Sequence, residues 1–333
     1  MTSNRSGWFV VALVAVAIGG CATGPESGGA GPGRPQAIET YVKGVYAYQA
    51  GKNDQAVDSL KQALETNPHL IMPRVFLGRI YKERGDYSSA REYYEALVAM
   101  DPYEVQNHYN LGLSDQMLQR LQDAIKSYNN ALKLDPNHFG SNMNLGLVYL
   151  ALGDVDKAIK YEDKAAMLKP ESAEAQANLA LTLDARGDYV LAERAYRKSI
   201  ELAPKQVGTL TNYAGNLLAQ QKPRDAADVI QQTLKLEDTP YLHKRLGDAY
   251  AMEQRYDEAL GQYREARKRN PKYFSALNEE ARVLLQQYQA GMELDEKKRD
   301  EALGLLRQSL EMNPQQPKVK SLLDQWEKRM FSK

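Results

Sequence analysis

The chain has 333 residues, with 43 Lys and Arg against 43 Asp and Glu, so its formal net charge at pH 7 is +0. This balance argues against a nucleic-acid ligand, since such binding calls for a strongly basic face. Cys21 is the only cysteine, which excludes an intramolecular disulfide framework. The folded part must therefore be held together by packing alone.

The N-terminal segment, residues 1–20, differs in composition from the rest of the chain. Arg5 is its only charged residue, an apolar run extends from Trp8 to Ile18, and two glycines follow. The run is too short to span a bilayer, which needs about 20 residues. It has the charge, length and small-residue exit of a secretory signal, so we predict a signal peptide over residues 1–20.

The residues around Cys21 extend this prediction. Ile18-Gly19-Gly20-Cys21 resembles a bacterial lipobox, which implies cleavage before Cys21 and attachment of a palmitate-bearing lipid to its thiol. The alternative is an ordinary signal peptide, or an uncleaved anchor, with a chance cysteine. By resemblance to lipoprotein sorting in two-membrane bacteria, Ala22 in place of Asp favours the outer membrane, with the chain facing the periplasm.

Residues 21–36 form the next segment, which is rich in Gly, Pro and Ser. Such a composition cannot bury apolar surface and behaves as a flexible linker. We therefore expect a tether that holds the folded part away from the membrane to which Cys21 is anchored.

The remaining chain is periodic. Five prolines stand 34 residues apart, at Pro68, Pro102, Pro136, Pro170 and Pro204. A fixed period of this length indicates a stack of similar supersecondary units. The units expected between residues 37 and 316 are 37–70, 71–104, 105–138, 139–172, 173–206, 207–239, 240–273 and 274–316, numbered here as repeats one to eight.

Each repeat carries the same residue types in the same order. A Leu-Gly pair is followed by an aromatic residue, a Gly-Asp turn, an alanine, a tyrosine and the proline, as in Leu77-Gly78, Tyr81, Gly85-Asp86, Ala90, Tyr94 and Pro102. Apolar spacings of three and four residues predict two amphipathic helices per repeat. Glycine ends the first helix, Asp can cap the second, and proline closes it. The tyrosine fills the gap that Gly or Ala leaves on the neighbouring helix.

This pattern resembles the tetratricopeptide repeat family over residues 37–316. The resemblance implies an all-α fold, a right-handed superhelical α-solenoid of about eight helix pairs, in which the first helices line a concave groove that binds a protein or peptide. Repeat one is a weak match, with Lys43-Gly44 for Leu-Gly, and so is repeat six, where Asp238 replaces the terminal proline.

The C-terminal end is irregular. Pro314 follows Pro271 by 43 residues, so repeat eight carries nine extra residues, between about 288 and 299. They form either a docking projection or a tolerated insertion that lengthens the helices. Residues 317–333 are expected to form a capping helix, since a solenoid must cover its last apolar face.

One polar residue recurs on the first helices. The candidate ligand-binding residues of the groove are Asn110, Asn144, Asn178 and Asn212. Carboxamides can donate to and accept from a peptide backbone without reading its side chains. The alternative is that these asparagines satisfy neighbouring groups of the fold.

Basic residues gather in repeat seven, among them Lys244, Arg245, Arg264 and Arg269, with acidic neighbours. They indicate either a solvated surface or contact with an acidic partner or lipid head groups.

Motifs for chemistry are lacking in the sequence. It has no Gly-rich phosphate loop, no His-Glu-x-x-His and no paired-cysteine metal site, and its four histidines lie about 30 or more residues apart in the chain. We therefore expect no enzyme activity, no cofactor or metal, and no small-molecule substrate.

Together these features predict a lipid-anchored, non-catalytic scaffold of the cell envelope. The specific hypothesis is an assembly factor for an envelope machine such as a type IV-like pilus or secretin. Scaffolding of surface polysaccharide export and regulation of envelope hydrolases are the alternatives.

Overall fold

The computed structural model describes residues 34–291 and 294–331. The predicted signal peptide, Cys21 and most of the predicted tether lie outside this range. The chain divides into two compact units, residues 1–148 and 149–333, with the boundary inside helix α8. Each unit is described by itself below.

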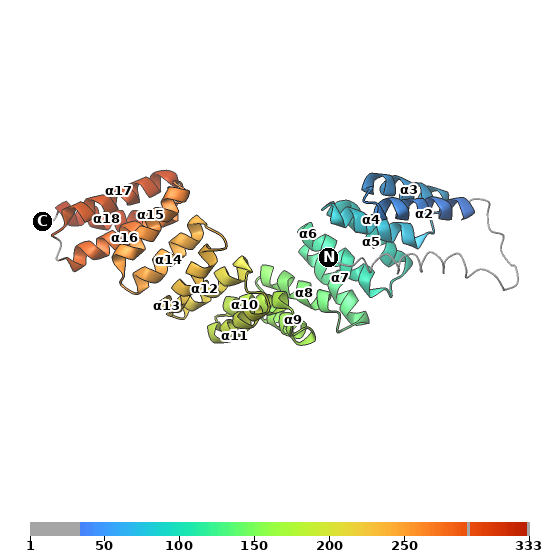
Figure 1. Cartoon of the computed structure of the whole chain (residues 1–333), viewed down its shortest axis with the longest axis horizontal. Coiled ribbons are helices and arrows are strands. Elements are labelled where there is room, and N and C mark those ends of the chain that lie inside the picture. The colour runs from blue at the N-terminus through green and yellow to red at the C-terminus, as the bar shows by residue number, and fades with distance from the viewer. Residues whose placement is uncertain (1–33, 292–293, 332–333) are drawn as a thin grey trace. The chain divides into compact units, whose positions relative to one another are not determined.

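The described residues form seventeen α-helices and no strand (Figure 1). The first helices of the eight pairs are α2 (Arg34–Gln49), α4 (Ile71–Glu83), α6 (Val105–Met117), α8 (Phe139–Ala151), α10 (Ala173–Arg186), α12 (Val207–Ala219), α14 (Pro240–Met252) and α16 (Phe274–Ala290). The second helices are α3 (Asn53–Thr66), α5 (Tyr87–Met100), α7 (Leu121–Leu134), α9 (Val155–Leu168), α11 (Tyr189–Leu202), α13 (Pro223–Leu234), α15 (Tyr256–Arg269) and α17 (Glu296–Met312). Helix α18 (Pro317–Phe331) follows the eighth pair. The predicted all-α solenoid with a capping helix is confirmed.

The turn inside each of the first seven pairs contains one left-handed residue. Glycine supplies it in four pairs, at Gly51, Gly85, Gly153 and Gly187, with φ between 73° and 91°. Where glycine is missing, a glutamine takes the same conformation, at Gln119, Gln221 and Gln254, with φ between 59° and 61°. The left-handed region is unfavourable for a residue with a Cβ, so packing on both sides of the turn must hold it there.

Most of the predicted helix ends are formed by the aspartate and proline residues that the sequence places there. Asp86 and Asp154 accept hydrogen bonds from the backbone N–H groups of Ser89 and Lys157, and so cap α5 and α9. Asp188 does not cap α11 and pairs with Arg186 instead. The second helices of the repeats with a terminal proline stop just before it, because proline has no N–H and would clash with the preceding turn.

The central packing element of a pair is a tyrosine of the second helix that lies against a glycine of the first. A Cβ placed on Gly78 would lie 3.0 Å from the ring of Tyr94, and one on Gly112 would lie 2.8 Å from Tyr128. Ring and backbone therefore touch directly, and burial raises the pKa of Tyr94 to about 12. The predicted filling of the glycine gap by tyrosine is confirmed at these repeats.

At the C-terminal end, the eighth pair has longer helices, and α18 packs against the core as the capping helix. Helices α16 and α17 have 17 residues each, against 13 or 14 in most other pairs, so the extra residues of repeat eight lengthen both helices. Helix α18 buries Val319, Leu323 and Trp326 in the core of the second unit. The indole ring of Trp326 meets the ring of Tyr288 edge-on, with centroids 5.9 Å apart.

Repeat seven offers a matched test of the tyrosine–glycine contact. A Cβ on Gly247 would lie 2.5 Å from the Tyr263 ring, whereas one on Gly261 in the same pair would meet nothing within 4 Å. We expect Gly247→Ala to cost about 1–3 kcal/mol, as overpacking does. Gly261→Ala should instead stabilise α15 by up to about 1 kcal/mol. Urea unfolding of both variants measures this, and equal shifts of the two midpoints would contradict the contact.

Candidate binding surface

The first helices are the elements on which the sequence places a binding surface. In the second unit α10 contacts α12, and α14 contacts α16, so first helices of successive pairs are direct neighbours. Residues at one position of the repeat therefore fall in register along these helices. The four candidate asparagines occupy that register, two in each unit.

The asparagines of the first unit are buried. Asn110, 7% exposed, accepts a hydrogen bond from Lys82 Nζ at 3.1 Å. Asn144, 8% exposed, directs its Nδ2 at the hydroxyl oxygens of Tyr109 and Tyr128, at 3.4 and 3.3 Å. Both carboxamides thus bond to neighbouring side chains of the fold.

The asparagines of the second unit are placed differently. Asn212 is exposed on α12, whereas Asn178 is half-buried on α10 and its Nδ2 atom is buried without a hydrogen-bond partner among the described residues. The four side chains therefore do not form one uniform row of accessible amides. Peptide contact stays a prediction, and Asn212 is the position where a ligand can reach the carboxamide without rearrangement.

The basic residues of repeat seven are largely neutralised within the fold. Each ion pair joins a cation of this repeat to a carboxylate at 4.0 Å or less: Lys244–Asp248, Arg255–Glu253, Arg255–Glu258, Arg264–Glu280, Arg264–Glu301, Arg267–Glu280, Lys268–Glu265, Arg269–Asp238 and Arg269–Glu265. Glu280 is fully buried and receives two of these arginines. The cluster is a set of ion pairs that joins the helices.

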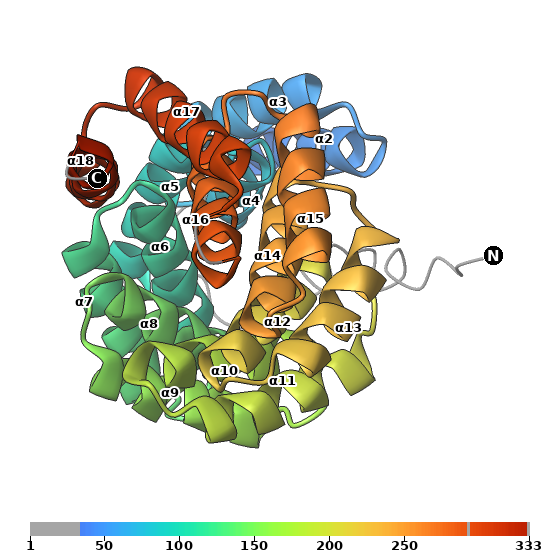
Figure 2. The ribbon, with the colours of Figure 1, turned by 90° about the vertical axis from the view of Figure 1, so that its left-hand side faces the viewer.

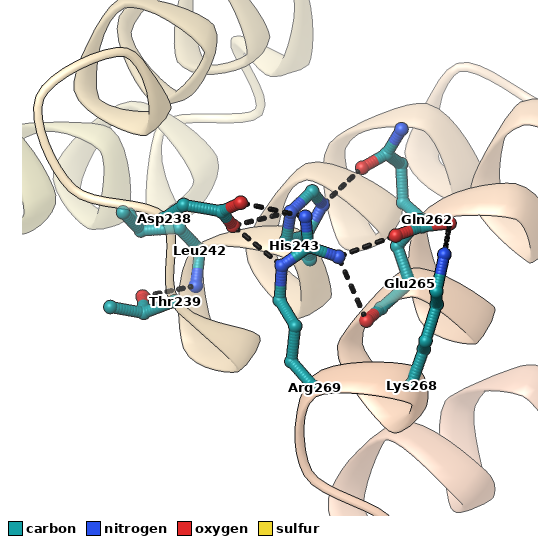
Figure 3. Close-up of polar contacts among 8 residues, drawn as sticks. All are labelled: Asp238, Thr239, Leu242, His243, Gln262, Glu265, Lys268 and Arg269. Atoms are coloured by element: carbon teal, nitrogen blue, oxygen red, sulfur yellow. Dashed lines mark hydrogen bonds and ion pairs between the residues drawn. The ribbon is translucent and has the colours of Figure 1, made fainter.

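One part of this cluster explains how repeat six does without its proline. Asp238, which stands in its place, binds Arg269 of α15 through two hydrogen bonds of 2.6 and 2.7 Å (Figure 3). The ring nitrogens of His243 lie 2.9 Å from Asp238 Oδ1 and 2.7 Å from Gln262 Oε1. These contacts tie the loop between α13 and α14 to both helices of repeat seven.

Two hollows lie against α16 in the second unit. The first, of about 430 Å³, is shared with α14 and is lined by Lys244, Asp248, Glu279 and Arg282, which balance in charge. The second, of about 460 Å³, is shared with α18 and is lined by Arg282, Lys318 and Arg329 without any carboxylate. Sequence reasoning missed both, since neither follows from a repeated position.

Glu162 is the most unusual buried group. It occupies, in repeat four, the position of Tyr94, Tyr128 and Tyr196 in their repeats, and it is 0% exposed. Both carboxyl oxygens lack a hydrogen-bond partner among the described residues. Burial, and to a lesser extent the charge of Glu174, raises the pKa of Glu162 to about 9, so the folded chain holds it protonated at neutral pH.

Tyr128 and Tyr196, at this position, have a hydrogen-bond partner on the first helix, which Glu162 lacks. The Tyr128 hydroxyl donates to Gln116 at 2.7 Å, and the Tyr196 hydroxyl donates to Asp184 at 2.9 Å. The corresponding first-helix residue of repeat four is Leu150, which offers no hydrogen-bonding group. Comparison of the repeats could have found Glu162 from the sequence, because it is the one acidic residue at a tyrosine position.

Two general tests of the described residues bear on function. In residues 34–291 and 294–331, no group of three His, Cys, Asp or Glu side chains is arranged to hold a metal ion. Over the same residues, every helix is too short or too polar to cross a membrane.

The arrangement matches a known family. Three models described as tetratricopeptide repeat match the chain, one at residues 109–169, 214–274 and 245–317, a second at 47–108 and a third at 173–206. The chain belongs to the tetratricopeptide repeat family. Tetratricopeptide repeat proteins are generally scaffolds for protein interaction, and a search of curated proteins finds no match.

Solved tetratricopeptide repeat structures share the fold. A protein from Parabacteroides merdae has a TM-score of 0.56 at 20% identity, covering 75% of this chain and 99% of its own. Pseudomonas aeruginosa pilF has a TM-score of 0.53 at 18% identity, covering 66% and 97%. A chain of the APC/C hetero-tetramer Cut9–Hcn1 has a TM-score of 0.57 at 18% identity, covering 81% and 52%. At these identities the likeness concerns the fold alone.

The raised pKa of Glu162 predicts how stability depends on pH. Between the unfolded value of about 4.5 and the folded value of about 9, the folded chain binds one proton more than the unfolded chain at this site. Stability should therefore fall as pH rises through this window, by at most about 1.4 kcal/mol per pH unit from this group.

Two uncharged replacements isolate this effect. Glu162→Gln and Glu162→Tyr, the residue of four other repeats, should both gain stability over the parent chain as pH rises from 5 to 8.5. Urea unfolding at several pH values measures the difference. Variant and parent curves that stay parallel across the window would show that Glu162 does not titrate as inferred.

Proposed function

We propose that this chain is a non-catalytic interaction scaffold that holds another protein, or a peptide segment of it, near a membrane of the cell envelope. The observation that carries the proposal is the run of eight helix pairs along almost the whole described chain. Tetratricopeptide repeat proteins generally bind proteins, and the second unit offers hollows along its first helices. In this proposal the chain itself catalyses no reaction.

The membrane part of the proposal rests on the sequence around Cys21. The signal-like segment ends at a cysteine preceded by small residues, and helix α2 starts soon afterwards at Arg34. Lipidation at Cys21 would anchor the chain in the outer membrane, with the repeats in the periplasm. The Gly- and Pro-rich residues between anchor and α2 suit a linker of this kind.

The pathway we propose is assembly of an envelope machine such as a type IV-like pilus or secretin. Surface polysaccharide export and regulation of envelope hydrolases are the competing pathways. Crosslinking in the native envelope followed by mass spectrometry separates them, because the captured protein is a pilus or secretin component, an exporter component or a peptidoglycan enzyme. Capture of none of these would contradict the proposed pathways, and capture of no protein at all would contradict the scaffold proposal.

The anchor has a direct test. Cys21→Ser removes the thiol that the lipid would occupy, so the variant should be soluble in the periplasm or remain as an uncleaved precursor. Membrane fractionation and the mass of the mature chain measure both results. Membrane association and mass identical to those of the parent would contradict lipidation at Cys21.

The predicted groove contact is best tested at Asn212, the exposed one of the four asparagines. Asn212→Ala removes an exposed carboxamide from the first helix α12, and Gln232→Ala removes one from the second helix α13 of the same pair. Loss of a hydrogen bond to a bound backbone should weaken partner capture by about fivefold for Asn212→Ala, while Gln232→Ala leaves it unchanged. Quantitative pull-down of the crosslinked partner measures both, and equal capture by the two variants would reject contact at Asn212.

A further inference from the structure

Helices α16 and α18 belong to the C-terminal end of the second unit (Figure 2). A hollow is lined by residues of both helices. Its floor is apolar and packed into the fold, since Leu285 and Trp326 are buried and Leu322 is half-buried. The Trp326 ring is 6% exposed and held by its contact with Tyr288. A ligand segment would thus meet a preformed surface.

The charge of this hollow is not balanced by its own lining. Lys318 is exposed and forms no ion pair among the described residues, and Arg282 lies at the limit of ion-pair distance, 4.0 Å, from Glu279. The Arg329 guanidinium lies 5.2 Å from the centroid of the Trp326 ring, at the same edge. Elsewhere in this unit, most cations of repeat seven already have carboxylate partners. The hollow therefore offers positive charge to an external anion, whereas most of the charge of repeat seven is neutralised within the fold.

Uncommitted hydrogen-bonding groups complete the lining. Gln286 and Gln289 of α16 and Ser321 and Gln325 of α18 all face the hollow. Their side chains form no hydrogen bond with another described residue, in contrast to Gln287 and Gln316 on the same two sides, which do. A carboxamide offers both donors and acceptors, so this set can pair with the backbone of an extended segment.

We propose that this hollow binds an extended acidic segment of a protein partner, with backbone groups on the glutamines and carboxylates on Lys318 and Arg282. The inference rests on the proposed scaffold function and gives the partner a chemical character. Lys318 and Arg329 are separated by about 16 Å along α18, at 1.5 Å per residue. An extended segment of about five residues spans that length at 3.3 Å each.

A protein segment fits this surface better than a lipid bilayer. In α16, and in α18 as far as Arg329, no large apolar side chain is exposed. A helix that enters a membrane interface needs such an apolar face. The hollow instead presents amides and cations above a floor that is already buried.

The test uses the full-length chain and a fluorescein-labelled hexapeptide of alternating Glu and Leu, with the Gln-for-Glu peptide as neutral counterpart. Fluorescence anisotropy should show about tenfold tighter binding of the acidic peptide, and sodium chloride should weaken it because the contacts are exposed to screening. Lys318→Glu should weaken binding about tenfold through charge repulsion.

Lys320→Glu is the matched control. Lys320 is exposed on the same helix, undergoes the same charge change and lines a different hollow, with Asp324 and Lys328. It should change the affinity less than twofold, and both variants should unfold at the same urea concentration. Equal weakening by the two variants, or equal binding of both peptides, would overturn the proposal.

Two further measurements separate this inference from other outcomes. Phosphatidylglycerol vesicles should bind Lys318→Glu and Lys320→Glu alike, and vesicle binding lost only with Lys318→Glu would assign the hollow to lipid and overturn the proposal. Envelope crosslinking of Lys318→Glu should lose the partner that the parent captures. Retained capture would refute this site while leaving the scaffold function intact, whereas the scaffold function itself fails only if the parent captures no partner.

Discussion

The contact on which three of the eight helix pairs depend is a tyrosine ring that packs directly against a glycine backbone. It occurs between Tyr94 and Gly78, Tyr128 and Gly112, and Tyr263 and Gly247. The absence of a Cβ lets the ring approach the first helix closely, which buries the ring and fixes the distance between the two helices. Helices of 13 or 14 residues are marginal in isolation, so this packing, repeated along the chain, supplies much of their stability.

Two residues that depart from the repeat pattern, Glu162 and Asp238, show which substitutions the fold tolerates. Glu162 takes a tyrosine position and keeps its proton, since the site offers it burial without a hydrogen-bonding partner. Asp238 takes a proline position, and its ion pair with Arg269 holds the shortened loop instead. The first is predicted to weaken the array as pH rises, and the second is compensated by an ion pair. A repeat can thus lose a consensus residue where its neighbours supply a different interaction.

The candidate binding groups are the polar side chains that form no hydrogen bond or ion pair within the fold. The buried asparagines of the first unit are joined to Lys82 and to tyrosine hydroxyls, and Arg264, Arg267 and Arg269 of repeat seven are joined to carboxylates. Between α16 and α18, in contrast, Lys318 and the carboxamides of Gln286, Gln289 and Gln325 have no such partner among the described residues. The regular repeats build the frame, while the lengthened last pair and its capping helix create a surface with a chemical character of its own.

The sequence by itself determined the period, the helix pairs, their ends and the capping helix, because these depend on local signals: a left-handed glycine, a capping aspartate, a terminal proline and a three-to-four-residue apolar spacing. It also placed the four asparagines on one register of the first helices. Only the tertiary structure decided which of them are accessible, which cations are neutralised and where a hollow opens. Those properties depend on partners about 15 to 40 residues away in the chain, such as Asp238 with Arg269 or α16 with α18, and no local pattern specifies them.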